Sequence, residues 1–305
     1  MSLEITVLGS NSALFAYGRH LTSQLITCGK SHFLVDCGEG TQLQIAKFGI
    51  KPSKISHILI SHLHGDHYFG LIGLLSSMHL LGRDKELNIY APVGLSEIIT
   101  TQFRYSQTAL KFKVNFIELT SEDSEVIFEN KSLSVFTIPL KHRLYTNGFL
   151  FKEKPKERRV NKEKLRPDFT IEQIKSLKKG QDIEGESGEV LFKNDDYTLD
   201  PKKAWSYAFC SDTAYTKETS TYVKGVDLLY HESTFGSNEQ DRAEITLHST
   251  AQQAAQVAKD AEVGMLMLGH YSTRYESIEY LLEEAREVFE NTIPSVEGEK
   301  IILDD

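Results

Sequence analysis

The chain has 305 residues, of which 40% are hydrophobic and 25% are charged, and its formal net charge is −9. This composition is typical of a globular protein long enough to bury a substantial core without disulfides, and it excludes a disordered or fibrous chain. The acidic balance also excludes a protein that coats nucleic acid with its whole surface.

The first 150 residues read as alternating strands and helices, as judged from the period of the hydrophobic residues. The last three of these strands follow without intervening helices, which argues against a purely doubly wound parallel sheet. The predicted strands lie at 3–8, 23–28, 31–36, 57–61, 87–91, 114–118, 126–129 and 132–138, and the predicted helices lie at 40–47, 66–81 and 94–108.

A long polar stretch begins after Phe151 and runs to about Asp200, with one short helical pattern at 169–177. Between Lys152 and Lys179 there are eleven Lys or Arg and five Asp or Glu, so this part has a net charge of +6 and the rest of the chain −15. Loops of this length inside an ordered domain are usually functional. We therefore predict a single domain over 1–305 that carries a protruding basic arm at about 153–199. A floppy surface insertion is the alternative.

The alternation of strands and helices resumes after the arm. Because the strand and helix pattern occurs on both sides of the arm, we expect an α/β fold in which two similar layers pack face to face with their helices outside. The predicted strands lie at 205–210, 226–230 and 264–268, and the predicted helices at 249–260 and 276–290.

The N-terminal residues, the apolar runs and the cysteines indicate the cellular location of the protein. The first residues alternate like a strand and lack the basic start and apolar core of a secretory signal. No apolar run approaches the ~20 residues needed to cross a bilayer, so we expect no membrane partner. Cys28, Cys37 and Cys210 show no paired spacing, which fits reduced thiols and a cytoplasmic location.

The strongest functional signal is the run Ser61-His-Leu-His-Gly-Asp-His67, which lies between an apolar strand and a helical pattern. Side chains two apart in an extended segment point the same way, so His62 and His64 can hold one ion. A turn at Gly65 can then aim Asp66 and His67 at a second ion. Imidazole and carboxylate ligands suit Zn²⁺ or Mn²⁺, and a catalytic zinc keeps a position for water. The alternatives are a surface histidine cluster and a closed structural zinc site.

Further ligands must come from later strand ends. His142, Asp212 and His270 each follow an apolar strand, and Asp212 could bridge two ions. Taken singly, each could be an ordinary polar residue that caps a strand. The remaining histidines lack this setting, and we expect them to be structural or solvent-facing: His20, His32, His57, His79 and His231.

The run at 61–67 resembles the signature of the metallo-β-lactamase superfamily. Over nearly its full length the chain resembles the ribonuclease Z family, endonucleases that trim 3′ trailers from precursor tRNA. The resemblance implies an αββα sandwich, with two mixed β-sheets, helices on the outer faces and the metals at one edge. The stretches that carry it are Asp36-Cys-Gly-Glu-Gly-Thr-Gln, Ser211-Asp-Thr, His231-Glu-Ser-Thr-Phe, His248-Ser-Thr and Gly269-His-Tyr-Ser-Thr-Arg-Tyr.

The resemblance also implies roles for individual residues. It implies two zinc ions per subunit, with Mn²⁺ as a substitute, one held by His62, His64 and His142, the other by Asp66, His67 and His270, and both by Asp212. It further implies that Asp66 helps to deprotonate the water, that Glu232 and His248 pass a proton to the leaving oxygen, and that Arg274 and Arg19 meet substrate phosphate. Glu232 could instead be a buried strand-end carboxylate, His248 a residue at a helix start, and Arg274 a partner of Glu276.

The resulting prediction is a cytoplasmic, homodimeric, zinc-dependent endoribonuclease, in which the arm of each subunit holds precursor tRNA against the metal site of its partner. Two stretches depart from the family. The arm lacks the family's glycine-proline motif and has Leu-Arg-Pro-Asp-Phe-Thr-Ile at 165–171, and the loop at 10–20 keeps only Arg19. The alternatives are a small-molecule hydrolase or phosphodiesterase of the same superfamily, and a non-catalytic RNA-binding protein in which metal only staples the sheet edge.

Overall fold

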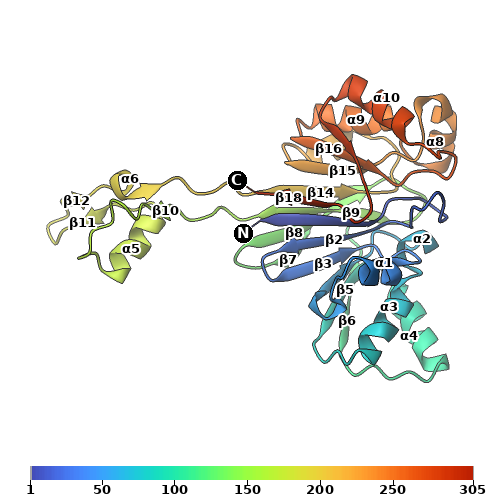
Figure 1. Ribbon diagram of the computed structural model, residues 1–305, viewed down its shortest axis with the longest axis horizontal. Helices are drawn as coiled ribbons and strands as arrows, with labels where there is room; N and C mark the ends of the chain where they lie inside the picture. The colour runs from blue at the N-terminus through green and yellow to red at the C-terminus, as the bar shows by residue number, and fades with distance from the viewer. Residues whose placement is uncertain (1, 305) are drawn as a thin grey trace.

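The computed structural model describes residues 2–304 and contains two seven-stranded sheets packed face to face (Figure 1). Helices cover both outer faces, so the predicted α/β sandwich is confirmed. The first sheet has the order β18 (Lys300–Leu303), β1 (Leu3–Gly9), β2 (Ser23–Cys28), β3 (Ser31–Val35), β4 (His57–Leu59), β5 (Leu87–Pro92) and β6 (Val114–Leu119). The second has the order β17 (Thr292–Pro294), β16 (Met265–Gly269), β15 (Leu228–Glu232), β14 (Ser206–Cys210), β9 (Thr146–Glu153), β8 (Leu133–Leu140) and β7 (Val126–Glu129).

Each sheet is antiparallel in one half and parallel in the other. In the first sheet β18, β1, β2 and β3 are antiparallel neighbours, and β3 to β6 run parallel. In the second sheet β17 to β14 run parallel, and β9, β8 and β7 add antiparallel strands. The carboxyl ends of neighbouring parallel strands lie at the same edge of a sheet, so the loops that follow them can meet at one end of the sandwich.

Three apolar layers hold the sandwich together. One lies between the sheets and includes Ile5, Phe33, Phe149 and Phe209, and one lies under the helices of each outer face. Burying one such side chain contributes roughly 1.5–3 kcal/mol, so these layers are the main source of stability. The helices are α1 (Thr41–Lys47), α3 (Leu71–Leu80) and α4 (Leu95–Tyr105) on the first sheet, and α7 (Lys217–Tyr222), α9 (Ala251–Asp260) and α10 (Glu279–Val288) on the second.

The structure differs from the predicted elements in several places: β17, β18, α7 and α8 (Gln240–Thr246) were not predicted, and two further differences lie inside the sandwich. The helix expected at 66–81 is split into α2 (Gly65–Tyr68) and α3, because Gly70 lies against the loop after β3, where a Cβ would come 2.2 Å from the carbonyl oxygen of Gly38. Strand β9 was not predicted, although it lies inside the second sheet. Its first residues, Thr146-Asn-Gly, and its last, Lys152-Glu153, are polar and hide the strand pattern.

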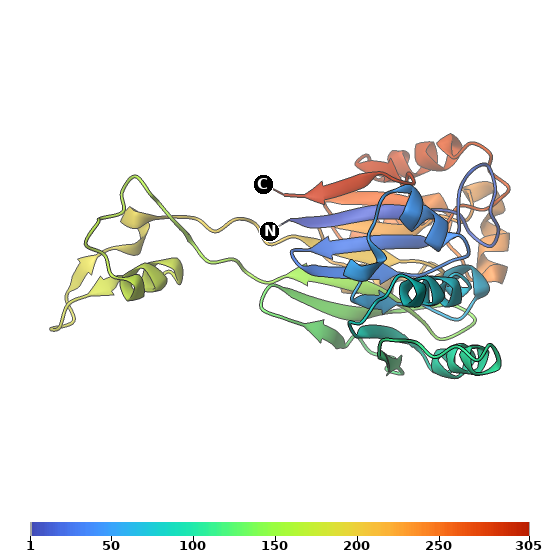
Figure 2. The same cartoon turned by 60° about the horizontal axis from the view of Figure 1, so that its bottom comes forward.

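The arm projects from the end of the sandwich where both chain termini lie, and α2 lies at the opposite end (Figure 1 and Figure 2). It has a small core of its own, in which Leu177 and Ile183 are buried and the Phe169 ring contacts the rings of Phe192 and Tyr197. Its elements are β10 (Arg159–Val160), α5 (Ile171–Lys178), β11 (Ile183–Glu184), β12 (Val190–Phe192), α6 (Asn194–Tyr197) and β13 (Thr198–Leu199).

The arm is basic only in its first part. Residues 153–199 contain eleven Lys or Arg and eleven Asp or Glu, because an acidic stretch at 182–196 follows the basic one. The expected boundary also moves, since Glu153 is the last residue of β9 and is 3% exposed. Its carboxylate accepts hydrogen bonds from Trp205 N at 2.9 Å and Lys156 Nζ at 2.8 Å, which ties both ends of the arm to the second sheet.

The arm should be dispensable for folding of the sandwich, because β9 and β14 pair directly with each other across its root. We expect a chain in which residues 157–202 are replaced by a short Gly-Ser linker to unfold cooperatively, with a midpoint within about 5 °C of the intact protein. Circular dichroism during heating measures this. Glu153→Ala in the intact chain is the contrasting variant and should lower the midpoint, because it leaves the partly buried Trp205 N–H unpaired. Loss of cooperative unfolding in the shortened chain would contradict the prediction.

Candidate metal centre and active site

Seven potential metal ligands converge at the end of the sandwich opposite the arm. Each follows the end of a strand or lies in α2, so the ends of both sheets contribute to one site. The residues are His62 and His64 after β4, Asp66 and His67 in α2, His142 after β8, Asp212 after β14 and His270 after β16.

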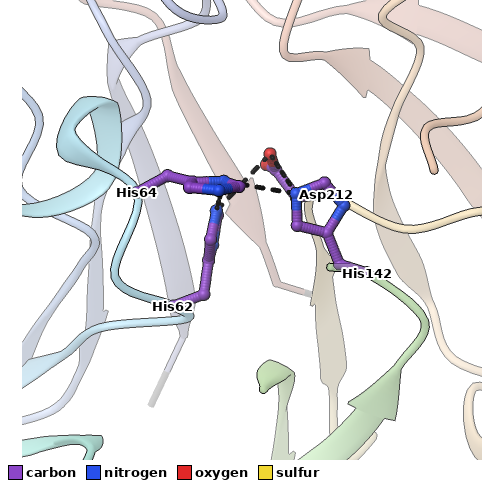
Figure 3. Close-up of side chains that lie close together, drawn as sticks. All are labelled: His62, His64, His142 and Asp212. Carbon is purple, nitrogen blue, oxygen red and sulfur yellow. Dashed lines mark hydrogen bonds and ion pairs between the residues drawn. The ribbon is translucent and has the colours of Figure 1, made fainter. Parts of the chain in front are cut away.

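The first set of ligands consists of three histidines and one oxygen of Asp212, and Figure 3 shows these side chains pointing toward one another. His64 Nδ1 lies 2.9 Å from His62 Nε2 and 3.2 Å from His142 Nε2. The Asp212 Oδ2 atom lies 3.6 Å from His62 Nε2. Three imidazole nitrogens gathered around a carboxylate oxygen are the ligand set of a zinc site.

The second set consists of Asp66, His67 and His270. Asp212 Oδ1 lies 3.1 Å from both His67 Nε2 and His270 Nε2, so the two oxygens of Asp212 face different sets. Asp66 Oδ2 lies 3.5 Å from His67 Nε2 and 3.6 Å from His270 Nε2. Both Nε2 atoms are buried and make no hydrogen bond within residues 2–304. Buried polar atoms are normally paired, so a cation fits this set of donors.

The backbone bends sharply at three of these strand ends. Asp36, Asp212 and His270 have φ values of 55°, 45° and 56°, which residues other than glycine rarely adopt. Such a residue costs about 1–3 kcal/mol and persists only where the surrounding structure holds it. The strain is therefore concentrated where the chain turns to aim side chains into the site.

A second layer of contacts orients the histidine rings. Asp36 is fully buried; its Oδ2 lies 2.7 Å from His67 Nδ1, and its two oxygens accept from Ser61 N at 2.8 Å and Ser61 Oγ at 2.9 Å. His142 Nδ1 donates to the carbonyl of Leu247 at 2.9 Å, and His270 Nδ1 lies 2.9 Å from Thr234 Oγ1. Because the Nδ1 atoms of His67, His142 and His270 are engaged in this way, the Nε2 atom of each ring faces the site. Asp36 was not assigned to the site from the sequence, although it directly follows the apolar residues Phe33-Leu-Val35.

Burial and neighbouring charges shift the protonation of the ligands, and the carboxylates of Asp212, Asp66 and Asp36 raise the pKa of His67, so a cation that binds there would replace its proton. Burial lowers the pKa of His62, so this ring is neutral and offers a lone pair. Burial alone would raise the pKa of Asp212, but His270, His67 and His62 lower it well below its usual range. The pKa of Asp66 is lowered in the same way, because His67 outweighs burial. Both carboxylates are therefore ionised.

Glu232 and His248 form an ion pair beside the ligands. The Glu232 carboxylate is fully buried, its Oε1 accepts from Thr213 N at 2.7 Å, and the same oxygen lies 2.8 Å from His248 Nδ1. Burial would lower the pKa of His248, but Glu232 outweighs it and raises the pKa to about 9. His248 thus carries a proton at neutral pH. It also lies near Asp212 and His270, but its Nδ1 is engaged by Glu232, so it is not counted among the seven ligands.

A cavity of about 370 Å³ opens over these groups, and its lining includes His64, Asp66, His248 and Arg274. Arg274 is exposed, and its side chain forms no ion pair or hydrogen bond within the described part of the chain, Glu276 included. A charged guanidinium without a protein partner is chemically suited to bind a phosphate.

Arg19 does not line this cavity. Its guanidinium donates to Asn11 Oδ1 at 3.1 Å, to the carbonyl of Glu276 at 2.9 Å and to the carbonyl of Tyr275. It therefore ties two loops together, which fits a loop anchor rather than the phosphate contact expected from the sequence. The histidines expected to be structural lie outside the ligand sets, and among them His20 pairs with Glu297 and His57 stacks on Phe33.

The chain is similar in sequence and in fold to several known proteins. A family model described as "Anti-Pycsar protein Apyc1" matches residues 3–155. The chain is 47% identical over 305 residues to a ribonuclease Z of Cytophaga hutchinsonii, covering 100% of this chain and 97% of the relative. The crystal structure of human tRNase Z, short form, matches with a TM-score of 0.72 and 26% identity over 99% of this chain and 100% of that one. A metallo-β-lactamase-fold protein of Bacillus subtilis matches with a TM-score of 0.68 and 17% identity over 99% and 100% of the two chains, which shows the shared fold.

Asp36 should be needed for tight metal binding, because it fixes the ring of His67 without touching the ligand atoms. We expect Asp36→Asn to weaken metal affinity by about 10–100-fold. Competition with a chromophoric chelator measures the affinity. Glu39→Gln changes a nearby exposed carboxylate and serves as the control. Wild-type affinity in a folded Asp36→Asn protein would contradict the assignment.

Proposed function

The chain belongs to the ribonuclease Z family, and on that premise we propose that it hydrolyses one phosphodiester of precursor tRNA to release the 3′ trailer. The observation that supports this best is the convergence of seven potential ligands and the charged Glu232–His248 pair on one open cavity. The chain is a hydrolytic endoribonuclease of the metallo-β-lactamase fold. A protein whose metal only staples a sheet edge would need neither the proton-carrying pair nor the cavity.

We propose two zinc ions per subunit, with Mn²⁺ able to replace them. His62, His64 and His142 would hold one ion, Asp66, His67 and His270 the other, and Asp212 both. The site contains no thiolate, and catalytic zinc sites are commonly built from imidazole and carboxylate. When bound, the two cations would stabilise charge on the phosphate oxygens and lower the pKa of a water molecule.

The side chains around the cavity supply the remaining chemistry. Asp66 is ionised and lines the cavity, so its carboxylate can accept a proton from the attacking water. His248 carries a proton and can give it to the 3′-oxygen that leaves, while Glu232 holds the ring and stabilises its charge. Arg274 would contact the phosphate on which charge develops, so its contribution grows in the transition state.

We further propose that the arm binds tRNA for the active site of a second copy. Within one subunit, β14 begins beside the root of the arm and ends just before Asp212, so the arm and the site lie at opposite ends of the sandwich (Figure 2). An arm that points away from its own site favours a role at the site of a second copy. Four exposed lysines on the arm make no ion pair within the described chain and are free to contact phosphates without reading sequence: Lys162, Lys164, Lys175 and Lys179.

A homodimer would bring an arm and a site together, and an apolar groove beside the site supports this arrangement. Leu14, Phe15, Leu43 and Phe69 line a groove of about 810 Å³ and are 66%, 61%, 68% and 58% exposed. Large exposed apolar patches are typical of interaction surfaces. We also propose a cytoplasmic location, because all three cysteines are free thiols and the proposed substrate is precursor tRNA. Within residues 2–304, no helix meets the length and hydropathy that a bilayer-crossing segment requires.

The small-molecule hydrolase remains the competing function. The matching family model ends at residue 155, before the arm and before Asp212, Glu232, His248 and His270. The ribonuclease Z relative, in contrast, matches over the whole chain.

Cleavage of precursor tRNA tests the proposed activity. With zinc or manganese, the wild-type protein should cut after the discriminator base, and His64→Ala should abolish cutting because it removes a ligand. His248→Ala should lower kcat by about 10²–10⁴-fold while the metal content stays unchanged. Gel analysis of labelled precursor and elemental analysis of the protein give these values. No cutting by the wild type, or equal cutting by His64→Ala, would exclude this function.

Mixed subunits test the role of the arm. The chain shortened at 157–202 should lose affinity for precursor tRNA, and the intact His64→Ala chain should be inactive. Mixing the two chains should restore cutting, because a heterodimer then holds one intact site and one arm on opposite subunits. Mixing with a His64→Ala chain that is also shortened is the matched control and should restore nothing. Undiminished tRNA affinity in the shortened chain, or no restoration in a heterodimer isolated by two tags, would refute the arrangement.

A further inference from the structure

Helix α8 (Gln240–Thr246) carries Arg242, a residue with no role in the reaction proposed above. The helix lies between Glu232 and His248 in sequence, and Ala243 anchors it in the core. Arg242 and Thr246 lie one turn apart and both line the cavity over the metal ligands. Arg242 therefore faces the same space as His248 and Arg274.

The guanidinium of Arg242 has no partner within the described residues. It forms neither an ion pair nor a hydrogen bond, although Asp241 and Glu244 lie on the same helix, and Glu244 instead accepts from Gln240 at 3.1 Å. Other arginines near the site are engaged by the protein: Arg19 holds two loops together, and Arg143 donates to the carbonyl of Ile245 at 3.5 Å. Within this cavity, Arg242 and Arg274 are the two cations left for a ligand.

We propose that Arg242 binds the RNA phosphate next to the scissile one, on the side that remains with the mature tRNA. The inference rests on the proposed function. A single scissile phosphate already meets Arg274 and the ligand cluster, so a second unpaired arginine in a space of about 370 Å³ points to a second phosphate. Arginine suits this contact because its planar fork can donate two hydrogen bonds to phosphate oxygens.

The link between α8 and His248 indicates on which side of the scissile phosphate the second phosphate lies. The backbone N–H of His248 donates to the carbonyl of Ala243 at 2.9 Å, so the residue after Arg242 is bonded directly to the proton donor. His248 faces the leaving 3′-oxygen, which belongs to the last nucleotide of the mature tRNA. The phosphate within reach of Arg242 is therefore the one that precedes this nucleotide. Such a contact strengthens binding of both substrate and product without entering the chemical step.

Arg242→Gln tests the proposal, with Arg242→Lys as the conservative variant and Arg104→Gln as the control. Arg104 is an exposed arginine on α4, over the outer face of the first sheet. For Arg242→Gln we expect KM for precursor tRNA and Ki for trailer-free tRNA both to rise about tenfold, as for the loss of one charged hydrogen bond. The kcat and metal content should stay within twofold of wild type. The slope of log affinity against log salt should fall by about 0.7–0.9, and Arg242→Lys should recover part of the loss.

Each other result overturns the proposal in a distinct way. Unchanged KM and Ki would mean that Arg242 meets no phosphate. A raised KM with unchanged Ki would place the phosphate in the trailer. An equal rise of KM in Arg104→Gln would mean that the loss of any surface positive charge produces the effect. A fall in kcat or metal content would mean that the substitution acts through the metal centre. Failure of the wild-type protein to cut precursor tRNA would contradict the proposed function instead, so the two failures can be told apart.

Discussion

The site depends on one buried carboxylate, Asp212, whose two oxygens face two different groups of imidazoles. An ionised carboxylate that is only 2% exposed is costly in a protein interior unless positive charge surrounds it. The surrounding histidines provide part of that compensation, and the unpaired Nε2 atoms of His67 and His270 favour cations that provide the rest. Folding of this end of the sandwich and binding of metal are therefore coupled, since each lowers the cost of the other.

The sheet architecture explains why the ligands come from distant parts of the chain. Residues that follow β4, β8, β14 and β16 meet because both sheets turn the same end toward the site. The left-handed turns at Asp212 and His270 then redirect the chain within two residues of the strand end. The same topology separates the arm from the site, because the connection from β9 to β14 lies at the other end of the sandwich. The candidate ligands and the arm thus lie at opposite ends of the same strands.

Much of the site could be inferred from sequence, because a polar residue directly after an apolar run is a local signal. That signal found His142, Asp212 and His270, and it would also have found Asp36 had the same criterion been applied there. Strand β9 was not predicted because its ends are polar and only its centre is apolar. The contacts of Arg19 could not be predicted because its partners include the backbone carbonyls of residues 275 and 276. The partners of a long cationic side chain depend on loop packing, which no local pattern records. The sequence did not single out Arg242 either, since only the folded chain shows that its guanidinium lacks a partner within the described residues.

The distribution of charge matters more than its total. A chain with a net charge of −9 repels RNA at long range, and an arm with equal numbers of acidic and basic residues does not reverse that repulsion. Attraction must come from local groups: the unpaired lysines near α5, and Arg274 and Arg242 at the cavity. Acidic surface elsewhere, including the stretch at 182–196 on the arm itself, makes wrong orientations unfavourable. An RNA that satisfies both groups of cations at once is held with its scissile phosphate at the ligand cluster, whereas one that meets a single group is held weakly.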